Sequence, residues 1–152
     1  MQGAVTAHQT GPATGVFAMD ELHRRVDDAL CTALTSDDAT FLPRFRALVD
    51  VLEDAFATEE SWMAEIDYPA IKSHREQHAR VLSGMHHVHC SLMAGNTDDV
   101  RKVVACLLPD WLTLHVATLD TALAMYLQAC GMPQLDSPLS AGQFLSRPEF
   151  RQ

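Results

Sequence analysis

Apolar residues recur at helical spacing along most of the chain, in four stretches separated by short polar segments. In the first stretch, Leu22, Val26, Leu30 and Leu34 follow one another at intervals of four, so they share one face of a helix. The alternating pattern that is typical of a β-strand is nearly absent. The pattern therefore predicts an all-α protein.

The segments between these stretches carry residues that start or stop helices. Asp20 suits the N-cap of the first helix, and residues 35–38 (Thr-Ser-Asp-Asp) are expected to break it. Pro43 suits the first turn of the second helix, because a helix does not need the backbone N–H of a residue in that turn.

Residues that start or stop helices also separate the apolar stretches in the second half of the chain. Asp67-Tyr68-Pro69 is expected to turn the chain into a third helix over about 70–94, which Gly95 ends. A fourth helix is expected from about residue 97 to Cys130. Four amphipathic helices of similar length with short connections predict an up-down-up-down four-helix bundle.

The length of 152 residues fits one domain with a sizeable core. We expect the bundle to span residues 19–130, after an N-terminal arm (1–18) and before a proline-bearing C-terminal tail (131–152). The formal net charge of -9 argues against binding to nucleic acid or to an anionic membrane, since both attract basic surfaces.

A cytoplasmic location is expected from three features of the sequence. The chain has no run of about 18 apolar residues, so no transmembrane helix is predicted. Its start lacks the basic and apolar regions of a secretory signal. The cysteines form no CxxC pair, and their wide spacing suggests buried thiols in a reducing compartment. They are Cys31, Cys90, Cys106 and Cys130.

Several polar residues fall on helix faces that the apolar pattern turns inward. His74 and His78 are four residues apart and therefore project from one face of the third helix. His115 lies in an apolar stretch of the fourth helix, and Asp120 follows five residues later, which in an α-helix is roughly 140° around the axis. These two side chains can meet only if each reaches in from its own side of the buried face.

Carboxylates and a further imidazole complete the candidate set. Glu59 lies in the second helix near Phe56 and Met63, and His23 lies near the start of the first helix. Burying such groups is costly unless they are paired or bound to a metal. Imidazole together with carboxylate suits iron, copper or zinc.

The order of these segments resembles the hemerythrin family. Asp20-Glu21-Leu22-His23 is similar to the family's Asp-x-x-His signature, and Phe56-Ala57-Thr58-Glu59-Glu60-x-x-Met63 is similar to its second-helix motif. Tyr68-Pro69 matches the turn that follows. His74-x-x-x-His78 and Trp111-Leu112-x-x-His115-x-x-x-x-Asp120 are similar to the motifs of the third and fourth helices. The resemblance covers roughly residues 19–129 and also implies the four-helix fold.

The resemblance implies a cofactor of two iron ions. By it, His74, His78 and His115 would hold one iron and His23 the second, while the carboxylates of Glu59 and Asp120 would bridge the two. It further implies that O2, or another small diatomic molecule or peroxide, is the ligand of the iron.

The chain departs from the family pattern at Ala55. In the family a second histidine for the second iron stands four residues before the bridging glutamate, and a methyl group cannot bind a metal. Asp27 lies four residues after His23, on the same helix face, so it is a candidate replacement ligand. The alternative is that Asp27 and Asp28 belong to a solvated helix edge with neighbouring arginines.

Two interpretations are also open for several other residues. Phe56, Trp111 and Leu119, with Trp62, would line a pocket for a small gas, or would serve only as core. His89 lies three turns beyond His78 and marks either a second polar site or a hydrogen-bonded histidine near the end of the bundle. His86 and His87 are expected to be exposed, and His8 lies in the arm.

Three functions remain open from the sequence. The first is reversible O2 binding for carriage, storage or sensing, which is binding without catalysis. The second is an oxidase or peroxidase-like reaction at the coordination position that Ala55 leaves open. The third is a single-metal or structural remnant. A ferritin-like oxidase is disfavoured because the chain has no Glu-x-x-His motif, and hydrolase and nucleotide-binding motifs are also absent.

Overall fold

The computed structural model describes residues 11–132 and residue 135. The described residues contain helices and no strand. The helices are α1 (Phe17–Thr35), α2 (Asp38–Glu65), α3 (Ile71–Met93), α4 (Thr97–His115), the π-helical turn η1 (Val116–Asp120) and α5 (Thr121–Ala129).

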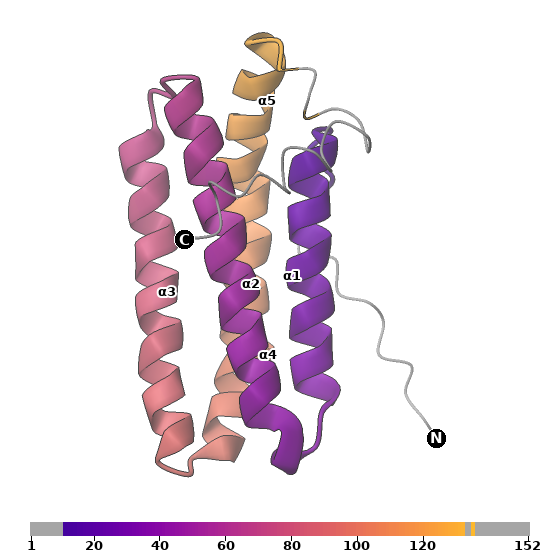
Figure 1. Cartoon of the computed structure of the whole chain (residues 1–152), viewed down its shortest axis with the longest axis vertical. Helices are drawn as coiled ribbons and strands as arrows, with labels where there is room; N and C mark the ends of the chain where they lie inside the picture. The colour runs from indigo at the N-terminus through magenta and orange to yellow at the C-terminus, as the bar shows by residue number, and fades with distance from the viewer. Residues whose placement is uncertain (1–10, 133–134, 136–152) are drawn as a thin grey trace.

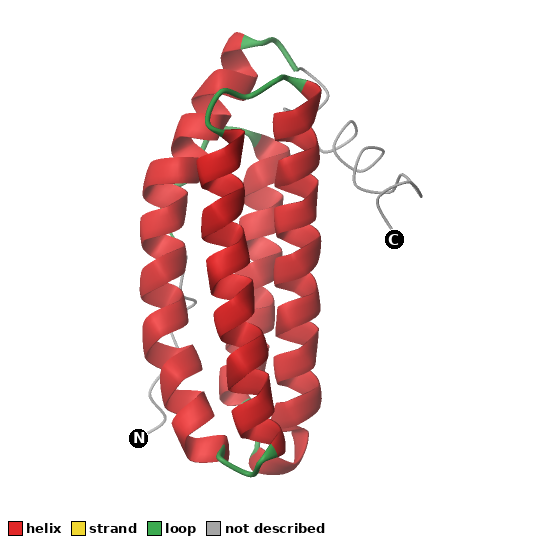
Figure 2. Cartoon of the chain, turned by 90° about the vertical axis from the view of Figure 1, so that its left-hand side faces the viewer, coloured by secondary structure: helices red, strands yellow, loops and turns green. Residues whose placement is uncertain are grey.

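Four helical rods lie side by side along the long axis of the molecule (Figures 1 and 2). The fourth rod consists of α4, η1 and α5 in uninterrupted succession. Each rod runs antiparallel to the one before it, so the chain passes down α1, up α2, down α3 and up the fourth rod in the view of Figure 1. The predicted all-α, up-down-up-down four-helix bundle is therefore confirmed.

The helix boundaries of the second half agree with the prediction, whereas two in the first half do not. α1 begins at Phe17, so Asp20 lies inside its first turn and is not the N-cap. The Asp20 carboxylate instead accepts hydrogen bonds from the backbone N–H (2.7 Å) and the hydroxyl (2.8 Å) of Thr14. It thus ties the preceding segment to the start of the helix, where a negative charge is also favoured.

The second helix starts about one turn earlier than expected. Asp37 is its N-cap, and the Asp37 carboxylate accepts a hydrogen bond from the backbone N–H of Thr40 at 2.9 Å. Pro43 consequently lies in the second turn of α2 and not in the first. The strong cap at Asp37 determines the start of the helix, and the helix continues past the proline.

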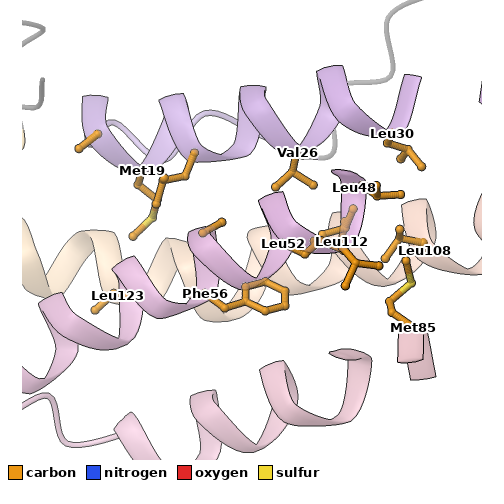
Figure 3. Packing of buried hydrophobic residues seen from close by; sticks show 14 of the residues in the cluster. Met19, Val26, Leu30, Leu48, Leu52, Phe56, Met85, Leu108, Leu112 and Leu123 are labelled. Carbon is orange, nitrogen blue, oxygen red and sulfur yellow. The ribbon is translucent and has the colours of Figure 1, made fainter. Parts of the chain in front are cut away.

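The core consists of apolar side chains from the inward faces of the rods. Figure 3 shows how Val26 of α1, Leu52 and Phe56 of α2, and Leu112 of α4 point toward one another. Burying each such side chain contributes about 1.5–3 kcal/mol. α3 is the exception, because the described structure buries only Met85, Leu92, His74 and His78 on this helix. Half of its buried residues are therefore histidines.

The expectation of buried thiols is wrong. Cys90, Cys106 and Cys130 are exposed and Cys31 is only partly buried, each as a free thiol. Cys106 illustrates the reason, since it lies midway between the buried Val104 and Leu108 in sequence and therefore points outward.

The fourth rod, Thr97–Ala129, is long and apolar enough to cross a membrane by length and composition alone. The core helix of a soluble protein passes the same test, and this rod packs as one of the four in the bundle. The fold therefore fits a soluble protein.

Candidate metal centre

Five buried polar side chains meet in the interior of the bundle. One ligand atom from each lies within 4.8 Å of the corresponding atoms of the other four. None of these residues is more than 4% exposed. The cluster comprises Glu59 of α2, His74 and His78 of α3, His115 at the end of α4, and Asp120 of η1.

The π-helical turn explains how His115 and Asp120 come together. The expected angle of about 140° between them assumed α-helical geometry throughout, and this assumption is wrong at Val116–Asp120. In a π-turn the backbone hydrogen bonds join residues five apart, so side chains five apart lie nearly above one another. The Nε2 atom of His115 accordingly lies 3.1 Å from Oδ1 of Asp120.

The three histidines turn the same ring nitrogen toward one point. Nε2 of His115 lies 3.2 Å from Nε2 of His74 and 3.1 Å from Nε2 of His78. A proton satisfies only a pair of such nitrogens, one as donor and one as acceptor, so protons alone serve this three-way contact poorly. A cation at the centre would accept a lone pair from all three.

The two carboxylates are placed between these imidazoles and His23. Oε2 of Glu59 is 3.2 Å from Nε2 of His78, and Oδ1 of Asp120 is 3.1 Å from Nε2 of His74. Within the described part of the chain, these two oxygens are buried and accept no well-aligned hydrogen bond. A bound cation would satisfy buried oxygens that lack a hydrogen-bond donor. The nitrogen and oxygen atoms of this cluster therefore suit a metal ion.

His23 lies at the edge of the cluster, where its side chain is 16% exposed. It donates a hydrogen bond from Nε2 to Oδ2 of Asp120 at 2.9 Å, and Oε1 of Glu59 lies 3.9 Å from the same nitrogen. Each carboxylate thus turns one oxygen toward the three histidines and the other toward His23. This arrangement would allow both carboxylates to bridge two cations.

Opposite charges in the cluster shift its pKa values strongly. Burial alone would lower the pKa of His74, yet the contacts with Asp120 and Glu59 raise that pKa to about 9. Burial likewise opposes protonation of His23, but Asp120 and Glu59 raise its pKa above the usual value. Burial would raise the pKa of Asp120, whereas the imidazoles of His115, His23 and His74 hold that pKa well below its usual range.

The pKa of Glu59 is also lowered. Burial and the charge of Asp120 act to raise this pKa, but contacts with His74 and His78 outweigh them. Without a metal, the cluster therefore pairs ionised carboxylates with a protonated His74 at neutral pH. A metal cation would take the place of that proton.

A second set of contacts orients His78 from outside the cluster. Glu60 accepts a hydrogen bond from Nδ1 of His78 at 3.1 Å, and its other oxygen lies 3.1 Å from Nε of Arg75. The bond to Nδ1 fixes the tautomer that leaves the lone pair on Nε2. Neither Glu60 nor Arg75 was predicted to take part in the site, although Glu60 stands beside Glu59 in the second-helix motif.

Aromatic rings cover the histidines on one side. Phe56 stacks on His78 with ring centroids 4.0 Å apart, and Trp111 stacks on His115 at 4.4 Å. Phe56 and Trp111 meet edge to face at 6.0 Å. Leu119, the third expected pocket residue, is half-buried on η1, and Trp62 is fully buried in the core.

Ala55 and Asp27 lie on the two helices that flank the edge of the cluster. Ala55 is buried (5% exposed) in α2, one turn before Glu59. Asp27 is half-buried and, with His23 and Asp20, lines a cavity of about 120 Å³ next to residues 11–13. Asp27 and His23 thus share a cavity, whereas Asp28 is exposed and pairs with Arg24.

The remaining histidines lie outside the cluster. His86 and His87 are exposed, as predicted. His89 is half-buried, stacks on Phe45 and accepts a hydrogen bond from Nε of Arg46 at 3.2 Å. His8 lies outside the described residues.

Comparison with known proteins places the chain in a family. Residues 14–127 match the family described as "Hemerythrin HHE cation binding domain". The bacteriohemerythrin of Ralstonia nicotianae (strain ATCC BAA-1114 / GMI1000) is 30% identical over 107 residues, which cover 68% of this chain and 77% of that protein. No solved structure matches the chain. The chain belongs to the hemerythrin family, and its buried His/Glu/Asp cluster marks it as a metal-binding member.

Proposed function

We propose that this protein binds iron in its buried cluster and uses it to bind O2, or another small diatomic molecule or peroxide, in the cytoplasm. The observation that carries the proposal is the convergence of three Nε2 atoms and two carboxylates on one interior point. The similarity to the bacteriohemerythrin of Ralstonia supports the family resemblance, which implies iron as the metal and O2 as its ligand.

In the proposed centre, the first metal position has more protein ligands than the second. His74, His78 and His115 would hold it, and the carboxylates of Glu59 and Asp120 would be shared with a second position at His23. Burial of the first group and the rings of Phe56 and Trp111 keep bulk water from it. Bound iron supplies the open coordination position at which a small ligand attaches.

The second position has fewer protein ligands. His23 is partly exposed and the methyl group of Ala55 cannot coordinate, so we expect weaker iron binding there. This feature supports two alternatives. A single-metal centre results if the second ion is lost. An oxidase or peroxidase-like enzyme results if the open position activates oxygen instead of holding it.

Asp27 is the candidate replacement ligand, because it lines the same cavity as His23. If Asp27 binds the second iron, directly or through water, Asp27→Ala lowers iron at that position and leaves the three-histidine position filled. The matched control is Asp28→Ala, which removes an exposed carboxylate from the next position of the same helix. Equal iron content in both variants would exclude a ligand role for Asp27.

The deciding experiment measures iron and zinc per chain in protein from iron-supplemented cells, together with visible spectra after anaerobic reduction and after O2 exposure. Two irons and a lasting spectral change with O2 would support reversible binding. Rapid oxidation that consumes O2 would favour the enzyme. One metal ion per chain without an O2-dependent spectrum would favour the single-metal centre and overturn the proposal.

A further inference from the structure

We propose that residues 11–16, a strap that precedes α1, control access to the metal cluster at His23 and admit only small molecules there. The strap forms the outer wall of the cavity of about 120 Å³ beside His23. Its wall residues are Gly11, Pro12 and Ala13. The identity of the admitted molecule rests on the proposed function, whereas the shielding of His23 does not.

The cavity has the size and the polarity for a small polar molecule. Its volume of about 120 Å³ corresponds to roughly four waters at about 30 Å³ each, and it is smaller than the cavity of about 150 Å³ that takes up benzene. Opposite the strap, α1 contributes the imidazole of His23 and the carboxylate of Asp27. Water, O2 and hydrogen peroxide therefore fit, whereas a branched organic molecule does not.

Asp20 holds the strap against the start of α1. Its carboxylate accepts hydrogen bonds from the backbone N–H (2.7 Å) and the hydroxyl (2.8 Å) of Thr14, and from the backbone N–H of Gly15 at 3.3 Å. Hydrogen bonds to a charged acceptor are roughly twice as strong as neutral ones. Val16, where the strap joins the helix, is buried. This end of the strap is therefore firmly attached.

The strap is also attached to the fourth rod. Gln128 of α5 donates a hydrogen bond from Nε2 to the carbonyl oxygen of Gly15 at 3.2 Å. Gly11 lies against Val116 of η1, because a Cβ at this position would be only 2.9 Å from Cγ1 of Val116. The φ angle of Gly11 is +126°, which L side chains rarely adopt, so the contact requires glycine. The strap thus connects α1 to the fourth rod, with the cavity between itself and α1.

Opening of the strap would be a local event. Its attachments are a few hydrogen bonds and one backbone contact, so they can break while the bundle stays folded. A molecule larger than the cavity reaches His23 only during such an opening. Loss of one ordinary hydrogen bond shifts an opening equilibrium by about fivefold, which sets the size of the effects expected below.

The first test uses metal-free protein, so its outcome does not depend on iron or O2. Diethyl pyrocarbonate modifies imidazoles and is too large for the cavity, and mass spectrometry gives its rate at His23 relative to the exposed His87. Thr14→Val removes a hydroxyl that holds the strap and should raise this relative rate by about fivefold. Gly11→Ala places a Cβ against Val116 and should raise it as well.

The matched control is Thr32→Val, which removes an exposed hydroxyl that bonds the backbone of its own helix, α1. This variant should modify His23 at the rate of the natural chain. Equal relative rates in the natural chain, Thr14→Val and Gly11→Ala would overturn the proposal, whether or not the protein binds iron.

The second test examines selection by size in iron-loaded protein. Hydrogen peroxide and tert-butyl hydroperoxide carry the same reactive group but differ in bulk, and the visible spectrum reports their rates of reaction. The natural chain should strongly prefer hydrogen peroxide, and Gly11→Ala should reduce that preference by accelerating only the bulkier reagent. An unchanged preference in Gly11→Ala and Thr14→Val would show that the strap does not select by size. If no iron binds, the proposed function fails and the metal-free test alone decides the role of the strap.

Discussion

At the scale of single residues, Ala55 has the largest consequence for the proposed function. Every other residue that the family resemblance implies as a ligand lies in the cluster or, like His23, at its edge. In the proposed centre the second position would therefore lack one imidazole, and its carboxylates would be shared with the first. We therefore expect one side chain, Ala55, to make the two proposed metal positions unequal.

Ala55→His is expected to supply the imidazole that the second metal position lacks. The new imidazole stands one turn before Glu59 on the same side of α2, so it adds a ligand to the second position. We expect binding of the second iron to tighten by about tenfold or more, and O2 to be held longer. Iron per chain at limiting iron and the lifetime of the O2-dependent spectrum measure the two effects. Ala57→His, on the exposed side of α2, is the control. Two tightly bound irons in the natural chain would contradict the prediction.

His74 makes metal binding depend on pH. Its pKa of about 9 in the folded chain lies above the ordinary value of 6.5, so at neutral pH a metal must displace a proton from it. Affinity for metal should therefore rise with pH, by as much as about tenfold per pH unit, and level off near pH 9. Competition with a chelator of known pH dependence measures this. An affinity that is constant between pH 7 and 9 would contradict it.

The metal-free protein should show the opposite trend in stability. A raised histidine pKa stabilises the folded chain fully below the unfolded value of 6.5, and this contribution is lost as pH rises through about 9. The lowered pKa of Asp120 stabilises the fold above its usual value of 3.8 and is lost in stronger acid. The melting temperature of the metal-free chain should consequently fall between pH 7 and 9 while metal affinity increases.

At the scale of elements, the apolar pattern together with the helix-breaking residues between its stretches was enough to predict four helices and the limits of α3 and of the fourth rod. The same pattern failed where local hydrogen bonds override periodicity. Asp37 caps α2 ahead of Pro43, and Asp20 binds the segment before α1 instead of capping that helix. The motifs shared with the hemerythrin family also predicted the polar residues that meet in the interior.

The π-turn could not be predicted from periodicity. A five-residue spacing between His115 and Asp120 conflicts with an α-helix, and the sequence alone left open how the two would meet. The structure resolves the conflict by changing the helix, because η1 adds a residue without breaking the rod. The contact of Glu60 with Arg75 was also beyond prediction, since it depends on how α2 packs against α3.

The pairing of α2 with α3 through Glu60 leads to a prediction for the centre. Glu60→Ala should lower metal affinity by about 10–100-fold, because His78 loses the partner that fixes its tautomer. Glu60→Gln keeps an oxygen that can accept from Nδ1 and should restore most of the affinity. Metal dissociation constants for both variants provide the measurement. Glu76→Gln, which removes an exposed carboxylate from α3, is the control. Equal effects of Ala and Gln at position 60 would rule out the positioning role.

At the scale of the whole molecule, the metal centre and the fold are expected to depend on each other. The cluster draws ligands from α2, α3 and the fourth rod, with His23 of α1 at its edge, so a bound ion would connect all four rods. Without an ion, the interior of α3 offers the bundle mainly two histidines and two apolar side chains. Much of the attachment of α3 would then rest on ion pairs within the cluster.

His78→Ala tests this dependence. The first position would keep two imidazoles, and Phe56 and Glu60 would lose their partner, so the variant should lose most of its metal. Metal at a hundred times its dissociation constant stabilises a fold by about 2.7 kcal/mol, or roughly 5–10 °C in melting temperature for a domain of this size. We therefore expect added iron to raise the melting temperature of the natural chain by about that much, and to leave that of His78→Ala nearly unchanged.

Comparing iron with a chelator in each protein removes the cost of the cavity itself, because that cost is present in both conditions. His87→Ala, on the exposed side of the same helix, should respond to iron as the natural chain does. If iron stabilised His78→Ala as strongly as the natural chain, the three-histidine position would not be where the metal binds.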